Sequence, residues 1–249
     1  MALPPFDALI LCATPRSGST LLLSLLASSG VAGRPEAWWR AQNREEFADA
    51  WGVPRDAAGR WTPADYHRAA LAAGRSSNGV FGLRVMPPTR PELLAELAAL
   101  FPGEGSDADL LARAFGRCRY VHLRRADTVA QAVSRVKAEQ SGLWHRIGDW
   151  EEREGGGGAA GYDPAAIAAF RAEAEAGNAG WAAWFAENAI EPLPVLYEDL
   201  ARDPVGVASA LIAALDLPPT PLAYANERLA DADSAAWAAR FRAERGMAG

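Results

Sequence analysis

A strand, a loop and a helix follow one another directly between Ala8 and Gly30. Residues 9–13 form a continuous apolar run, typical of a strand buried on both faces of a parallel sheet. The loop that follows reads TPRSGST over residues 14–20, and leucines then recur with helical spacing up to Gly30. N–H groups at a helix start lack partners within the helix and carry the positive end of its dipole. The sequence therefore predicts a cradle for phosphate or sulfate at this turn.

The loop lacks the lysine of the nucleotide-hydrolase P-loop. That motif, G-x-x-x-x-G-K-[ST], places a lysine after its last glycine, whereas Ser19 follows Gly18 here. Gly18 lets an anion approach the backbone closely, and Arg16 supplies a fork of donors that suits phosphate or sulfate oxygens. Ser17, Ser19 and Thr20 add hydroxyl donors. The alternative is an ordinary turn in which the serines only cap the helix.

Length and composition favour a single α/β domain over residues 1–249. Half of the 249 residues are hydrophobic, which provides a full core. The formal net charge of −6 argues against nucleic acid as a partner. Cys12 and Cys118 lie in or beside apolar runs and are predicted to be reduced thiols. We see no signal peptide and no membrane-length apolar segment, so we expect a cytoplasmic protein without a membrane span.

Further apolar runs alternate with helical patterns along the chain. Residues 80–86, 120–123 and 194–197 read as strands, and helices are expected over 91–101, 162–188 and 205–215. This alternation predicts a P-loop-like domain with a central parallel sheet flanked by helices. The aromatic residues of the 162–188 helix are expected in the core or at a dimer contact; these are Trp181, Trp184 and Phe185. The glycine run 155–158 is expected to be a mobile loop.

Ligands of such a sheet bind beyond the carboxyl ends of its strands. The 14–20 loop, Met86-Pro87 and Arg124-Arg125 each follow a predicted strand, so they are expected at one edge. Two separate anion sites on one edge suit a ligand with anionic groups at both ends. An adenosine that carries 3′ and 5′ phosphates has this shape.

Four segments resemble the bacterial trehalose 2-sulfotransferase family. They are RSGSTLL with GVAGRPEAWW (16–39), FGLR (81–84), RRADTVAQAVSRVKAEQSGLWH (124–145) and the W-x-x-W-F…I-E-P-L…Y-E-D-L stretch (181–200). Cytosolic sulfotransferases carry a lysine in PKSGTT where Arg16 stands here. The resemblance spans most of the chain in matching order. It implies transfer of a sulfuryl group from 3′-phosphoadenosine 5′-phosphosulfate (PAPS) to a sugar hydroxyl, without a metal.

The resemblance also implies residue roles for the donor. Residues 16–21 would hold the 5′-phosphosulfate; these are Arg16, Ser17, Gly18, Ser19, Thr20 and Leu21. Arg124, Arg125 and Ser134 would hold the 3′-phosphate. Other sulfotransferases place an Asp four residues before the serine. Here Asp127 lies seven residues before Ser134, and Gln131 stands four residues after Asp127. Whether Gln131 or Ser134 makes the contact is left open.

For the acceptor, the resemblance implies that Glu36 is the general base, with Arg16 neutralising the developing charge. A carboxylate can take the proton as the hydroxyl attacks in line. His145 is the rival base. The other acceptor residues would be Thr14, Gly33, Arg34, Pro35, Trp38, Trp39 and Arg84, with the two indoles stacked on the sugar. The family further implies a homodimer.

Two other functions fit a nucleotide-binding loop of this kind. A P-loop small-molecule kinase would need a loop lysine and an acidic metal ligand after a strand, and neither is evident. A non-catalytic nucleotide-binding module would keep the fold, but Glu36 beside intact anion loops argues against it.

Overall fold

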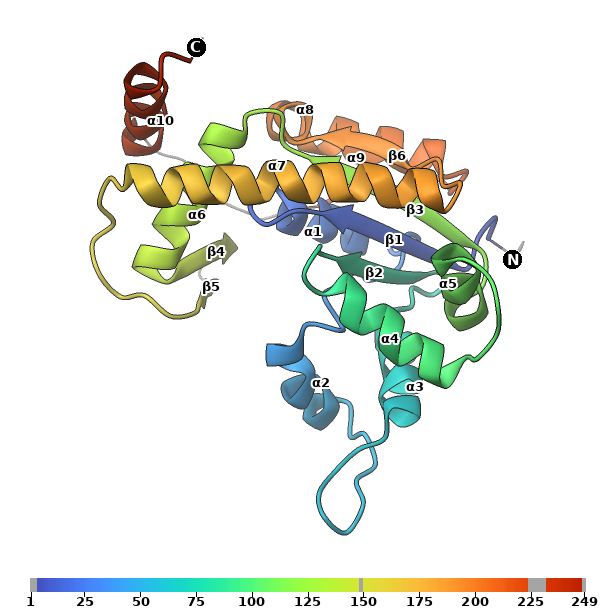
Figure 1. Cartoon of the computed structure of the whole chain (residues 1–249). Helices are drawn as coiled ribbons and strands as arrows, with labels where there is room; N and C mark the ends of the chain where they lie inside the picture. The colour runs from blue at the N-terminus through green and yellow to red at the C-terminus, as the bar shows by residue number, and fades with distance from the viewer. Residues whose placement is uncertain (1–3, 148–149, 224–231, 248–249) are drawn as a thin grey trace.

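Strand β1 (Ala8–Ala13) lies inside a four-stranded parallel sheet whose order is β2-β1-β3-β6. The computed structural model describes residues 4–147, 150–223 and 232–247. β1 pairs in parallel with β2 (Phe81–Val85) and β3 (Cys118–Arg124), and β6 (Leu193–Leu196) extends the sheet beside β3. All six residues of β1 are buried. The predicted α/β fold with a central parallel sheet is confirmed (Figure 1).

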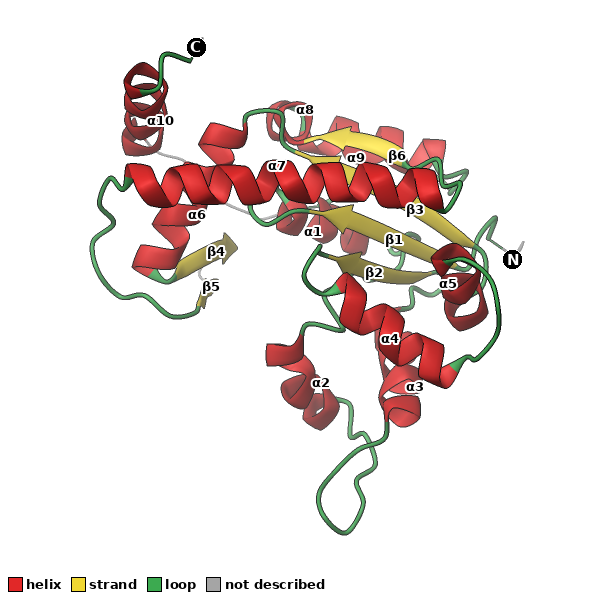
Figure 2. Ribbon diagram, in the orientation of Figure 1, coloured by secondary structure: helices red, strands yellow, loops and turns green. Residues whose placement is uncertain are grey.

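Side chains alternate along β1 between two apolar layers. Ile10 and Cys12 face a layer that includes α4 (Arg90–Leu100), α5 (Asp107–Phe115) and α7 (Pro164–Glu187). Leu9 and Leu11 face the opposite layer, formed by α1 (Ser19–Ser29), α8 (Tyr197–Arg202) and α9 (Pro204–Ala214). Helices thus cover both faces of the sheet (Figure 2), which explains why its central strand is apolar throughout. Three aromatic residues of α7 were expected either in the core or at a dimer contact, and they lie in the core: Trp181, Trp184 and Phe185.

A third apolar cluster joins α7 to α6 (Thr128–Ser141) and α10 (Ala232–Glu244). Asp127 caps α6, because its carboxylate accepts the N–H of Ala130 at 2.9 Å. This cluster places α6 beyond the carboxyl ends of β1 and β3, with α10 on its outer side (Figure 1). The helix is therefore fixed beside the loop that follows β1.

A small lobe separates α1 from β2 in the chain. It contains a 3-10 helix, η1 (Ala41–Asn43), with α2 (Arg44–Ala50) and α3 (Pro63–Gly74), and it projects away from the sheet (Figure 1). Aromatic rings fill its interior: Trp38 lies 5.2 Å from Phe47 and 5.3 Å from Trp51 between ring centres. No helix was predicted from the sequence in this segment.

A two-stranded antiparallel sheet, β4 (Leu143–Ile147) and β5 (Trp150–Arg153), follows α6 and was also not predicted. The glycine run 155–158 leads away from it. This run packs tightly on the end of α6, since a Cβ on Gly142 would collide with the Gly155 carbonyl and one on Gly156 with the Gly142 backbone. The expected mobility of the run stays a prediction.

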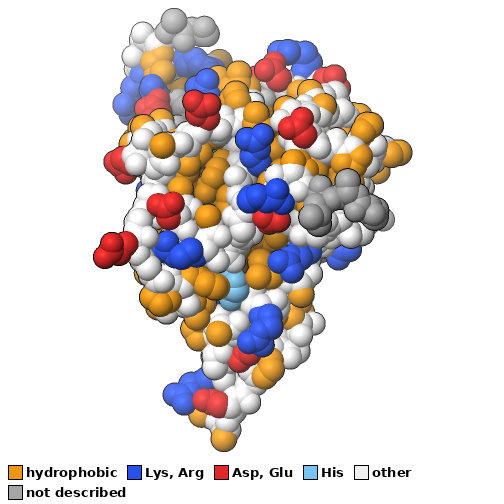
Figure 3. Space-filling view, turned by 90° about the vertical axis from the view of Figure 1, so that its right-hand side faces the viewer, with side chains coloured by type: hydrophobic (Ala, Val, Ile, Leu, Met, Phe, Trp, Pro, Cys, Tyr) orange, Lys and Arg blue, Asp and Glu red, His pale blue; other side chains and the backbone are white. Residues whose placement is uncertain are grey.

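The face at the amino ends of the strands carries basic and acidic side chains side by side (Figure 3). Asp7 and Arg117 lie at this end, 2.9 Å apart, and Arg117 holds the pKa of Asp7 below its ordinary value. Cys12 and Cys118 are free thiols, and burial raises the pKa of Cys118 to about 12. Within the described residues, no helix has the length and apolar character needed to span a membrane.

Two histidines are held neutral by their surroundings and make stability pH-dependent. Burial lowers the pKa of His67, which stacks on Phe115 with ring centres 5.4 Å apart, and that of His122, 5.2 Å from Phe185. The unfolded chain takes up these protons near pH 6.5, while the folded chain does so only at lower pH. We expect the free energy of unfolding to change little between about pH 7 and 8 and to fall as the pH drops through 6.5, by up to about 1.4 kcal/mol per histidine per pH unit.

Urea unfolding at pH 7.5 and 5.5 measures this loss. The His67→Leu variant should lose less stability over the same interval than the wild type. An equal loss in both proteins would show that His67 does not contribute.

Candidate active site

Two left-handed residues turn the chain from β1 into α1. Arg16 has φ 62° and Gly18 has φ 89°, in the region that favours glycine. A Cβ at Gly18 would also collide with the ring of Tyr197. Ser17 lies between them, wholly buried, and its hydroxyl donates to the Thr14 carbonyl at 2.7 Å. Ser17 thus holds the turn rather than facing a ligand, which corrects the expectation that its hydroxyl contacts the donor.

The N-terminus of α1 opens into a cavity. The first hydrogen bond of the helix runs from the Leu22 N–H to the Gly18 carbonyl at 3.2 Å. The backbone N–H groups of residues 19–21 therefore have no carbonyl partner within the helix. The N-cap residue is Gly18, which has no side chain to cap this end. All three residues line the cavity. The anion site that the sequence predicts at this turn would lie at these N–H groups.

This cavity has a volume of about 1860 Å³ and lies beyond the carboxyl ends of the strands. The loop after β1 forms one wall, and α6, α7, α8 and β4 contribute others. Thr14, Arg16, Gly18 and Arg84 line it, as expected for site residues. Its size accommodates a nucleotide together with a second ligand.

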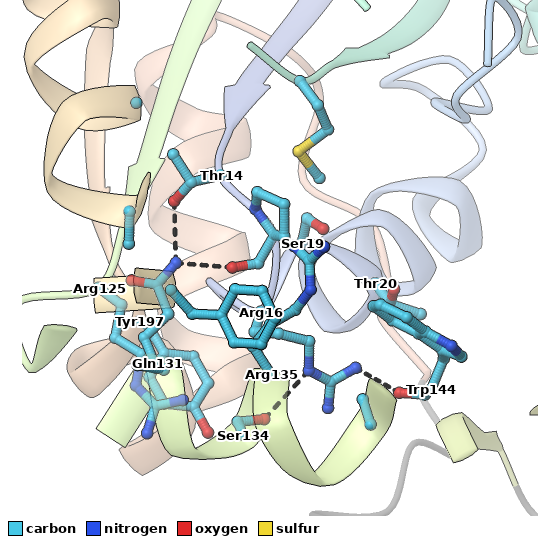
Figure 4. A pocket seen from close by; sticks show the side chains of 18 of the residues that line it. Thr14, Arg16, Ser19, Thr20, Arg125, Gln131, Ser134, Arg135, Trp144 and Tyr197 are labelled. Atoms are coloured by element: carbon cyan, nitrogen blue, oxygen red, sulfur yellow. Dashed lines mark hydrogen bonds between the residues drawn. The ribbon is translucent and has the colours of Figure 1, made fainter. Parts of the chain in front are cut away.

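The Arg16 side chain lies across this cavity (Figure 4). Its Nε donates to the Ser134 hydroxyl of α6 at 3.0 Å, and its Nη1 donates to the Trp144 carbonyl of β4. Its guanidinium lies 6.0 Å from the centre of the Trp144 ring. Arg16 therefore joins the anion loop to two elements that come more than 100 residues later.

Gln131 and Ser134 both reach the loop, in different ways. Gln131 is buried, and its Nε2 donates to the Thr14 hydroxyl at 2.9 Å and to the Pro15 carbonyl at 2.7 Å (Figure 4). Ser134 is half-buried and accepts from Arg16. Both residues line the cavity.

The two arginines after β3 have separate positions. The guanidinium of Arg125 lies 4.4 Å from the centre of the Tyr197 ring and lines the cavity. Arg124 is exposed, at the end of β3, and does not line it. Of the arginine pair expected at the 3′-phosphate, only Arg125 borders the cavity, and its contact with an anion stays a prediction.

Glu36 is held at the edge of the sheet. It forms an isolated parallel bridge with Leu83, and the Arg84 N–H donates to its carbonyl at 2.9 Å. Its Oε1 accepts from Arg84 Nη2 at 2.8 Å, and Arg84 Nη1 lies 3.4 Å from the Ser19 hydroxyl. One guanidinium thus connects the carboxylate to the start of α1. Glu36 does not line the cavity itself, but its neighbours Ala37 and Arg84 do.

The residues before Glu36 support this edge and do not line the cavity. Gly33 has φ 78°, and a Cβ there would collide with the backbone of Gly82. Pro35 packs on Gly82 from the same side, while Arg34 is exposed. Gly33 and Pro35 therefore support the segment that carries Glu36, and contact of Gly33, Arg34 or Pro35 with the acceptor stays a prediction.

Trp38 and Trp39 lie in the core, with 9% and 3% of their surface exposed. Trp38 Nε1 donates to the Gly82 carbonyl at 2.8 Å, and Trp39 Nε1 donates to Glu96 at 2.8 Å. Their faces pack on other rings of the small lobe. The expectation that these indoles stack on a sugar is wrong for this structure.

A family model described as Stf0 sulphotransferase matches residues 8–244. The chain belongs to the Stf0 sulphotransferase family. Two trehalose 2-sulfotransferases, from Mycobacterium tuberculosis (strain ATCC 35801 / TMC 107 / Erdman) and Mycolicibacterium smegmatis (strain ATCC 700084 / mc(2)155), are each 32% identical to it. Each alignment covers 94% of this chain and 94% of the relative. The family resemblance predicted from the sequence is thus confirmed.

A solved structure, the sulfotransferase domain from the Synechococcus PCC 7002 olefin synthase, matches with a TM-score of 0.43 and 16% identity. That match covers 87% of this chain and 75% of the domain. Membership of the family rests on the family model and the two trehalose 2-sulfotransferases.

Three cavity residues of this sulfotransferase were not singled out from the sequence. Trp144 and Arg135 face Arg16 across the cavity, with the Arg135 guanidinium 5.4 Å from the Trp144 ring centre. Tyr197 packs on Gly18 and on Arg125. Tyr197 was detectable as the tyrosine of Y-E-D-L. Trp144 was not singled out, because its contact with Arg16 depends on the β4–β5 hairpin, which was not predicted.

His145 was the other candidate for the general base. The side chain of His145 lies outside the part of the chain whose side chains are described. Among the described residues, no group of three or more His, Cys, Asp or Glu could hold a metal ion.

Gly18 and Gly30 cap opposite ends of α1, both at positive φ, and offer a matched test of the cradle. Gly18→Ala adds backbone strain and a collision with Tyr197 beside the anion site. Gly30→Ala adds strain alone, because nothing lies within 4 Å of its new Cβ. We expect both variants to lose about 1–2 kcal/mol or more of stability.

Only Gly18→Ala should weaken binding of adenosine 3′,5′-bisphosphate, by at least about tenfold, in calorimetric titrations. Equal affinities in the two variants would show that the start of α1 does not bind the nucleotide.

Proposed function

We propose that this sulfotransferase moves a sulfuryl group from PAPS to a hydroxyl of a sugar, with trehalose as the first candidate. Its family and its similarity to two trehalose 2-sulfotransferases at 32% identity support this acceptor. The observation that carries the chemistry is the contact chain from Ser19 through Arg84 to Glu36. It places a carboxylate one guanidinium away from an anion cradle.

The residues that line the cavity fit such a donor. The N-terminus of α1 and the guanidinium of Arg16 would hold the 5′-phosphosulfate. Arg125 and Ser134 lie on the α6 side of the cavity and would hold the 3′-phosphate. The donor supplies an activated sulfuryl group whose leaving group is a phosphate. The protein supplies charge, orientation and a base.

Glu36 would act as the general base. The acceptor hydroxyl oxygen attacks sulfur, and a new O–S bond forms as the bond from sulfur to the 5′-phosphate oxygen breaks. The hydroxyl proton passes to the Glu36 carboxylate, and adenosine 3′,5′-bisphosphate departs. Arg84 orients the carboxylate at 2.8 Å, while Arg16 would neutralise charge that builds on the departing phosphate. Glu36 is 42% exposed in its side chain, so an acceptor can reach it.

The proposal also covers the domain organisation, cellular location and oligomeric state of the enzyme. From the family resemblance, we infer one domain over residues 1–249 that acts in the cytoplasm as a homodimer. Sedimentation of the purified protein tests the dimer directly, and a monomer at micromolar concentration would contradict it.

The Glu36→Gln variant tests the base. It keeps the size of the side chain but removes the proton acceptor, so we expect turnover to fall by about 10²-fold or more. Affinity for adenosine 3′,5′-bisphosphate should stay within about twofold of the wild type. Glu46→Gln, an exposed carboxylate of α2, is the matched control and should keep full turnover. Wild-type turnover in Glu36→Gln would assign the base to another group.

The acceptor is tested with a sulfate-labelled donor and a panel of sugars. We expect label to pass to trehalose, and to pass more slowly to monosaccharides, since these fill less of the cavity. Label on no sugar of the panel would overturn the proposed acceptor class.

A further inference from the structure

The side-chain amide of Gln131 points toward the loop after β1, whereas a residue that binds an anion would point its donors into the cavity. The Gln131 side chain is only 1% exposed, yet it borders the cavity from α6. Its Nε2 donates to the Thr14 hydroxyl at 2.9 Å and to the Pro15 carbonyl at 2.7 Å. Both N–H groups of the amide are therefore used by the loop. Its Oε1 is buried without a hydrogen-bond partner among the described residues.

The Pro15 carbonyl fixes the orientation of the Gln131 amide. A carbonyl oxygen only accepts hydrogen bonds, so the amide must present its nitrogen to the loop. Its oxygen is then left in a buried position, at a cost in stability. A buried acceptor without a partner is uncommon in native proteins and calls for a reason. The contacts with the loop supply one.

The second contact acts on a strained residue. The Pro15 carbonyl belongs to the peptide group whose nitrogen is that of Arg16, and the orientation of this peptide sets the Arg16 φ of 62°. A non-glycine residue keeps such a φ only where its surroundings hold it. Ser134, three residues after Gln131 and on the same face of α6, holds the side chain of Arg16 at 3.0 Å. One face of α6 thus fixes both the backbone and the guanidinium of Arg16.

We propose that Gln131 is a positioning residue that holds the Pro15–Arg16 peptide, and through it the 5′-phosphosulfate cradle, in the binding conformation. It does not bind the 3′-phosphate, because its donors face the loop. The proposal rests on the proposed function only for the identity of the ligand.

Hydrogen exchange tests the positioning role without any ligand. In Gln131→Met, which keeps the length of the side chain but has no donor, we expect faster exchange over residues 14–21 than in the wild type. The matched control is Val136→Ala, which lowers stability from the same helix but borders the apolar cluster rather than the cavity. It should leave exchange over 14–21 unchanged. Unchanged exchange in Gln131→Met would overturn the proposal, whatever the protein binds.

Binding of two nucleotides, one with and one without a 3′-phosphate, shows whether Gln131 positions the loop or contacts the 3′-phosphate. We expect Gln131→Met to weaken adenosine 3′,5′-bisphosphate and adenosine 5′-phosphate by the same factor, about tenfold, because the 5′ cradle is shared. Thr14→Val removes one of the two acceptors and should weaken both nucleotides by a smaller common factor. A loss confined to the bisphosphate would make Gln131 a ligand of the 3′-phosphate and would overturn the proposal.

Activity gives the third readout. The variant should raise the KM for the donor while kcat falls less, since the loop can still reach the binding conformation once the donor is present. A fall in kcat with an unchanged KM would contradict a role in donor binding. Failure of the wild type to transfer sulfate would overturn the proposed function, while the exchange result would still decide the role of Gln131.

Discussion

The open N-terminus of α1, held at the end of a buried strand, is the constraint on which the rest of this structure depends. Its first N–H groups have no carbonyl partner within the helix, and the N-cap residue, Gly18, has no side chain that could cap them. The turn that aims them requires Gly18 at φ 89° against Tyr197 and Arg16 at φ 62°. The strain in this turn is maintained by surrounding elements, which is common where a protein preorganises a binding site.

Three distant parts of the chain converge on that turn. Helix α6 holds it through Gln131, and α7 holds the strand end, where Trp181 Nε1 donates to the Ala13 carbonyl at 3.0 Å. From the other side, the segment paired with β2 brings Arg84 to Ser19 and Glu36 to Arg84. Each contact crosses the open edge of the parallel sheet, where ligands of such folds bind. An anion and an attacking hydroxyl would meet there.

The strand–loop–helix unit was predictable because its signals are local. Apolar runs mark β1, β2 and β3, and Asp127 marks the start of α6. The environment of Trp38 and Trp39 was not predictable, because it depends on how residues 33–36 pair with β2 and close the small lobe over the rings. The roles of Ser17 and Arg124 depend on side-chain direction, which a motif does not fix. The sequence carries a hairpin signal between β4 and β5, the pair Gly148-Asp149, but the charged segments on either side do not read as strands. The contact of β4 with Arg16 was therefore not predicted.

The central claim is that the α1 cradle, with Arg16 in place of a lysine, binds an adenosine that carries phosphates at both ends and needs no metal to do so. Calorimetric titration of the purified protein with adenosine 3′,5′-bisphosphate, and separately with ATP and magnesium, measures it most directly. The account predicts saturable binding of the bisphosphate that is unchanged by a chelator, and much weaker binding of ATP. Tighter binding of ATP with magnesium than of the bisphosphate would contradict it.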